Sequence, residues 1–127
     1  MNRTLLLSGM LAALAAAQIQ AAPSPISTRE GALTDPAGMT LYVFAKDQPG
    51  NGRSACNGPC AALWPPLAAE ADAQPEGDLG LIARDDGSRQ WSWRGKPLYR
   101  FAQDLAPGER KGDNFKQLWQ VARPWPL

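Results

Sequence analysis

Cys56 and Cys60 are the only two thiols of this 127-residue chain, and they enclose the segment Asn-Gly-Pro. In an oxidising compartment two cysteines at this spacing pair readily, and the closed loop would contribute about 2 kcal/mol of stability. Alternatively, the thiols form a redox couple or a soft Cu(I) site, because thiolates select such metals. A thioredoxin-like motif has two intervening residues rather than three, and Met39 is the only methionine outside the first 22 residues. We therefore predict a structural disulfide and keep the redox or copper role as the alternative.

Asp47 and Asp104 are the second candidate pair, because each ends a similar stretch of sequence. Two carboxylates from equivalent positions could hold a cation or perform acid–base chemistry. An aspartate before a turn more often accepts hydrogen bonds from backbone N–H groups of that turn. Since Pro-Gly follows shortly after both residues, we favour the turn role.

Histidine is absent from the chain. Its absence removes Ser-His-Asp and Cys-His nucleophile pairs and the usual imidazole sites for zinc and copper. Any activity would have to use carboxylates, lysines or the two thiols. We predict no catalytic residues, no cofactor and no metal site.

A ten-residue phrase occurs twice and positions these candidates. Residues 38–47 and 95–104 both read Gly-x-x-Leu-Tyr-x-Phe-Ala-x-Asp, and a Leu-Trp pair follows each copy. The order of landmarks predicts two copies of one supersecondary unit. The repeat-motif residues are Tyr42, Phe44, Asp47, Tyr99, Phe101 and Asp104.

The pattern of β-branched and aromatic residues and turns predicts a mainly β fold, a small antiparallel domain built from two pseudo-symmetric repeats. Expected strands cover residues 40–45, 79–84, 89–94 and 98–103, with a closing strand within 115–123 and a short helix at 61–64. Alternation predicts an aromatic core face in both repeats, and Trp91 and Trp93 share a face opposite Gln90 and Ser92. We expect six rings to be largely buried: Tyr42, Phe44, Trp64, Tyr99, Phe101 and Trp119.

The ends of the chain suggest export. Arg3, an apolar run and small residues near Ala22 have the order of a cleavable signal peptide over residues 1–22. The apolar run is too short for a membrane anchor, so we expect no stable membrane insertion after cleavage. We predict a disordered leader at 23–30 and a single domain at 31–127. Within it, repeat one spans 31–67, an exposed linker 68–78, and repeat two 79–123.

Charge limits the partners. Loss of Arg3 with the leader leaves twelve basic and twelve acidic residues, so the exported chain is formally neutral. A neutral surface provides no long-range field for nucleic acid or anionic membranes. The partner is then an unknown envelope protein or a small ligand. Trp125, between two prolines near the end of the chain, is the tryptophan that we expect to be exposed.

The doubled Tyr-x-(Phe/Trp/Tyr)-x-x-Asp phrase resembles the family of secreted repeats and predicted lipoproteins that carry this motif. Similar blocks lie at residues 53–67, around the cysteine pair and Trp-Pro-Pro, and at residues 86–99. The resemblance implies an exported bacterial protein, periplasmic or secreted, with no established activity. This chain has no cysteine for lipid attachment at the cleavage region. We therefore expect a non-enzymatic binding module, with the thiol-based redox or Cu(I) function as the alternative.

Overall fold

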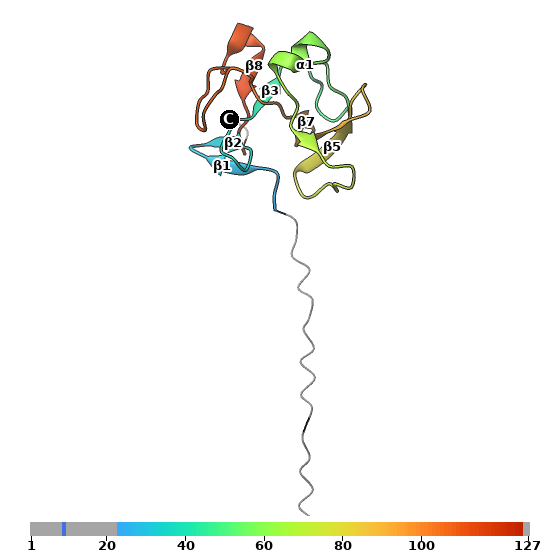
Figure 1. The fold of residues 1–127 in the computed structure, drawn as a ribbon. Helices are drawn as coiled ribbons and strands as arrows, with labels where there is room; N and C mark the ends of the chain where they lie inside the picture. The colour runs from blue at the N-terminus through green and yellow to red at the C-terminus, as the bar shows by residue number, and fades with distance from the viewer. Residues whose placement is uncertain (1–8, 10–22, 126–127) are drawn as a thin grey trace, which may run out of the picture.

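The computed structural model describes Gly9 and residues 23–125, so the predicted signal peptide lies outside the described residues except for Gly9. The fold is mainly antiparallel β, as predicted (Figure 1). No helix within the described residues is long and apolar enough to cross a bilayer. In chain order the elements are β1 (Ser27–Arg29), β2 (Ala32–Thr34), β3 (Tyr42–Phe44), α1 (Pro59–Leu63), β4 (Ala68–Ala69), β5 (Leu79–Ala83), β6 (Arg89–Trp93), β7 (Lys96–Pro97), the 3-10 helix η1 (Phe115–Gln117) and β8 (Trp119–Val121).

Two lobes make up the fold, and each combines segments of both repeats (Figure 1). The terminal lobe contains β1, β2 and β3 from repeat one and β8 from repeat two; β3 pairs antiparallel with β8. The central lobe contains β5, β6 and β7 from repeat two, joined by β4 from repeat one, which pairs with β6. Each repeat therefore gives its Leu-Trp segment to the lobe of the other.

One pair of residues joins the lobes by reciprocal backbone hydrogen bonds. Tyr42 and Tyr99 exchange backbone hydrogen bonds, N–H to carbonyl, with N···O distances of 2.8 and 3.0 Å. A closed ring of three backbone bonds also recurs in each lobe, so the two are related by an approximate twofold rotation. The rings run through Leu33, Ala122 and Leu41 in the terminal lobe and through Trp91, Leu67 and Leu98 in the central lobe.

The core is a stack of four aromatic rings. Trp64 and Trp119 lie face to face at the centre, with ring centroids 3.8 Å apart and planes 2° apart. Phe101 stacks on Trp64 at 4.3 Å, and Phe44 stacks on Trp119 at 4.2 Å. Each tryptophan thus packs on the phenylalanine of the other repeat. Five of the six predicted core rings are buried, and Phe44 is half-buried against the cluster.

Proline explains why the equivalent strands differ. The predicted strand at 98–103 forms only isolated bridges, because its partner is Pro65-Pro66, which has no N–H groups to donate. Arg100 donates its N–H to the Pro65 carbonyl, but no bond can return from a proline nitrogen. The same prolines lie just after α1. This helix begins at Pro59, two residues before its predicted start, and ends at Leu63, one residue before its predicted end.

The predicted disordered leader is wrong for residues 27–29, which form β1. Glu30 and Gly31 both have positive φ, 48° and 76°, as a two-residue hairpin turn requires. Arg94 and Gly95 make the equivalent turn between β6 and β7, with φ of 48° and 82°. The predicted exposed linker is also too long at its start, because Ala68–Ala69 form β4.

The two faces of β6 alternate as predicted, but the buried face is the polar one. Gln90 and Ser92 are buried, whereas Trp91 and Trp93 are half-buried. Gln90 is satisfied in the core, since its amide donates to the Leu98 carbonyl and its Oε1 accepts a bond from the buried guanidinium of Arg84 at 2.6 Å. A polar residue with every bond made can occupy a core position, and alternation alone does not identify that case.

Candidate functional site

The motif tyrosines and aspartates form two hydrogen bonds, each between different repeats. The Tyr42 hydroxyl donates to Oδ2 of Asp104 at 2.6 Å, and the Tyr99 hydroxyl donates to Oδ2 of Asp47 at 2.5 Å. The four residues are all buried. The tyrosine of each motif thus bonds the aspartate of the other motif, and the sequence repeat alone did not predict this exchange.

Both carboxylates also anchor the loop that follows them. Oδ1 of Asp47 accepts the Ala55 N–H at 2.7 Å, and Oδ1 of Asp104 accepts the Lys111 N–H at 2.9 Å. The turn role expected for these aspartates agrees with these bonds. Both oxygens of each carboxylate therefore accept a hydrogen bond from the protein. No cluster of three metal-binding side chains occurs among the described residues.

Burial governs the protonation of these groups. It raises the pKa of Tyr42 and of Tyr99 above the ordinary value, and the hydrogen bond to an aspartate adds to the rise. Burial also raises the pKa of Asp47, while the hydrogen bonds from Tyr99 and Ala55 oppose this rise. The phenols therefore stay neutral and donating at physiological pH, as a structural role requires.

Cys56 and Cys60 form the predicted disulfide, with Cα atoms 5.2 Å apart. Cys56 is fully buried in the aromatic cluster that contains Trp64, and Cys60 packs against it. The Cys56 carbonyl accepts a bond from the Arg84 guanidinium at 2.6 Å. These contacts place the disulfide in the core at the end of the loop that Asp47 anchors.

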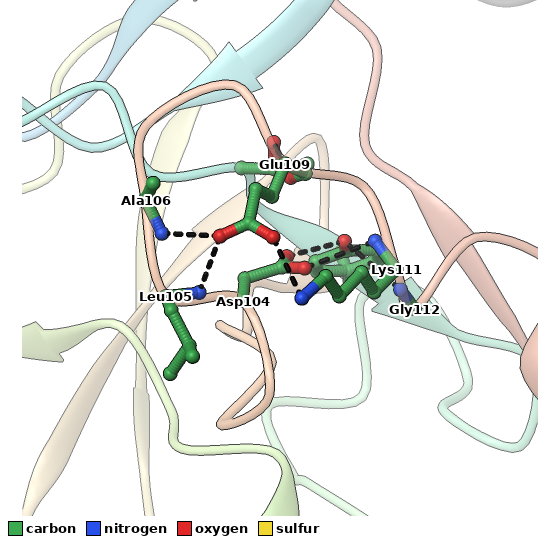
Figure 2. Close-up of polar contacts among 8 residues, drawn as sticks. Asp104, Leu105, Ala106, Glu109, Lys111 and Gly112 are labelled. Atoms are coloured by element: carbon green, nitrogen blue, oxygen red, sulfur yellow. Dashed lines mark hydrogen bonds and ion pairs between the residues drawn. The ribbon is translucent and has the colours of Figure 1, made fainter.

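The equivalent loop of repeat two has no disulfide and is held by a glutamate instead. Oε1 of Glu109 accepts the N–H groups of Leu105 and Ala106, at 2.9 and 2.5 Å (Figure 2). Its Oε2 lies 2.8 Å from the Lys111 ammonium. The Leu105 side chain stands out from this loop and is 80% exposed.

A cleft of about 600 Å³ opens between the lobes. Val43 of β3 is one of the residues that line it. The central lobe contributes Trp93 and Lys96, and the terminal lobe contributes Arg123 and Trp125. Trp125 is 53% exposed, as expected from its position between prolines. The remaining lining residues are Arg94, Asp113, Asn114, Gln120, Val121 and Ala122.

The position of repeat two that corresponds to Val43 has a different residue and a different contact. Arg100 replaces Val43 there, and its Nε lies 3.7 Å from Oδ2 of Asp35, in the turn after β2. An ion pair thus links the lobes on one side, and the cleft separates them on the other. The sequence contained one sign of this difference, the change from Val43 to Arg100 at otherwise matching positions, but not the location of the cleft.

Comparison with known proteins agrees with the repeat. The model of a family described as a secreted repeat of unknown function matches residues 25–68 and again residues 80–123. No curated protein and no solved structure was found to match the chain. The two family matches together cover more than half of the chain, and each contains one copy of the motif. The protein therefore belongs to this family of secreted repeats of unknown function, of which it carries two copies.

Proposed function

We propose that this exported protein is a non-enzymatic binding module of the bacterial envelope, periplasmic or secreted, and that the interlobe cleft binds a small ligand. The observation that carries the proposal is the lining of the cleft, to which each lobe gives one tryptophan and at least one cation. Its volume of about 600 Å³ lies within the range of small-molecule sites.

The rest of the molecule supports a binding role over catalysis. The motif carboxylates and phenols are engaged in hydrogen bonds that hold the lobes together. The cleft lies directly against the core, since Val121 and Ala122 in its lining are buried core residues. Lys96, Gln120 and Trp125 are among the exposed side chains of the lining.

The thiol-based alternative would need a reachable, reduced Cys56. Burial of Cys56 in the aromatic cluster favours the structural role instead. Counting free thiols on protein isolated without reductant tests this point. We expect no titratable thiol, and two would revive the alternative.

A fragment screen by two-dimensional NMR tests the binding role. The isotope-labelled exported protein would be mixed with neutral, cationic and anionic compounds. We expect hits to shift the amide signals of Val43, Lys96 and Gln120, and Trp125→Ala to reduce these shifts. Leu105→Ala is the matched control, because Leu105 is exposed but lies outside the cleft. A screen in which no compound perturbs the cleft signals would disprove the proposal.

A further inference from the structure

The two walls of the cleft present the same chemistry in different residues. On the central lobe, Trp93 ends β6 and Lys96 begins β7, across the two-residue turn. On the terminal lobe, Arg123 and Trp125 follow β8. A ligand between the walls would therefore meet an indole and a cation from each side.

The charges of the cleft favour an anion. Lys96 and Arg123 form no ion pair within residues 23–125. Arg94 is paired with Asp78 at 3.4 Å and lies over the Trp93 ring at 5.3 Å. Asp113 is the one acidic lining residue, and its Oδ1 accepts the Val121 N–H at 3.3 Å. In a chain that is nearly neutral, this local excess of cations would attract a negatively charged group.

Trp125 is exposed and lies near the β1–β2 turn. Arg123 donates from Nη1 to the Gly31 carbonyl at 3.5 Å, which ties the terminal segment to the β1–β2 turn. A Cβ atom at Gly31 would lie 3.9 Å from Cζ2 of Trp125 and 3.7 Å from Nη1 of Arg123. Both are ordinary van der Waals distances, so the side chains of Arg123 and Trp125 lie beside the β1–β2 turn.

The polar lining suits hydroxyl groups. Asn114 and Gln120 both carry an amide that can donate and accept, and both are exposed at the cleft. Indole rings provide flat apolar surfaces with a polar edge, on which the C–H faces of a sugar ring can pack. Cations, amides and indoles together match a ring that bears both hydroxyl and carboxylate groups.

We propose that the cleft binds an acidic saccharide, in which sugar rings pack on Trp93 and Trp125 while carboxylates pair with Lys96 and Arg123. This inference rests on the proposed function, since it names the ligand class of the same cleft. The ligand is assigned to saccharides rather than nucleotides because the lining pairs its indoles with amides suited to hydroxyl groups.

Titration calorimetry and NMR with trigalacturonate as the probe test the inference. Maltotriose has similar rings without carboxylates, citrate has carboxylates without rings, and uridine monophosphate represents a nucleotide. We expect trigalacturonate to bind at the cleft signals, and the other three at least about tenfold more weakly. Raised salt should weaken trigalacturonate binding, because the attracting charges are exposed.

Variants separate the contributions of charge and ring. Lys96→Gln and Arg123→Gln should each weaken trigalacturonate binding about tenfold, and Trp125→Ala by a comparable factor. Lys46→Gln is the matched control, since Lys46 is exposed and does not line the cleft. Equal effects of Lys46→Gln and Lys96→Gln would show nonspecific attraction and overturn the inference.

Each probe has a defined outcome. If citrate binds as tightly as trigalacturonate, the rings have no role in binding. If maltotriose binds as tightly as trigalacturonate, the charges have no role. If uridine monophosphate binds more tightly than trigalacturonate, the ligand is not an acidic saccharide. If trigalacturonate fails to bind while fragments of another class occupy the cleft, the inference fails and the binding function stands. If no compound reaches the cleft, both fail.

Discussion

The two loops that follow Asp47 and Asp104 are anchored to these aspartates by equivalent hydrogen bonds, but each loop is reinforced in a different way. In both, the aspartate accepts an N–H from the far end of its loop and a hydroxyl from the tyrosine of the other repeat. Repeat one then adds a disulfide in the core, whereas repeat two adds the half-buried Glu109. The tyrosine–aspartate bonds are thus common to both repeats, while the reinforcement of each loop differs.

The central ring stack should produce the largest loss of stability. Trp64→Ala and Trp119→Ala each remove a ring that stacks on two others, and each should lower the free energy of unfolding by about 3 to 5 kcal/mol. Denaturant unfolding measures both, and Trp125→Ala is the matched exposed control. Strongly unequal losses at Trp64 and Trp119 would contradict their equivalence.

The exchange between repeats can be measured by double-mutant cycles. Tyr42→Phe combined with Asp104→Asn should show a coupling of about 1 to 3 kcal/mol in the free energy of unfolding, because a buried bond to a carboxylate is lost. Tyr42→Phe combined with Asp47→Asn should show little coupling, although both belong to one repeat. The reverse pattern would mean that each motif closes on itself.

The loop reinforcements should differ in size. Replacing Cys56 and Cys60 by alanine should lower the free energy of unfolding by about 2 kcal/mol from loop entropy. Glu109→Ala should cost less, because its bonds are exposed to solvent. Thermal unfolding of the two variants side by side makes the comparison. A larger loss for Glu109→Ala would reverse our ranking of the loops.

Ionisation of the two tyrosines has the smallest expected effect on stability near neutral pH, and alkaline titration measures it. The folded-state pKa of Tyr42 and of Tyr99 is raised, so their contribution to stability is complete below the ordinary value of 10.0 and is lost as the pH rises above it. The chain has only two tyrosines, so the tyrosinate absorbance reports these alone. We expect little ionisation at pH 10 and a rise that accompanies unfolding. Half-ionisation of a folded protein at pH 10 would disprove their burial as neutral donors.

The sequence predicted the parts that repetition and alternation encode. It identified the two copies, the fold class, the aromatic core and the cysteine pair. It did not identify the exchange of the Leu-Trp segments, because alternation assigns a residue to a face and not to a partner. It did not identify the polar face of β6 as the buried one, because the groups that hydrogen-bond Gln90 are the Arg84 guanidinium and the Leu98 carbonyl, both outside the strand.

The cleft illustrates a different limit. Its lining comes from β3, from the β6–β7 hairpin, from the loop before η1, and from β8 and the segment after it. The first two of these are far from the others in the chain. No local pattern links these residues. The change from Val43 to Arg100 became informative only when the structure placed Asp35 beside Arg100.

The exchanged strands have a consequence for chains of other lengths. A protein with one repeat would expose an unpaired β3 and a tryptophan without its stacking partner, and a second copy of the same chain could supply both. We expect a single-repeat chain to pair with a second copy in the way that the two repeats pair here. Residues 70–78 connect the repeats, so a break in this segment should leave the two halves assembled.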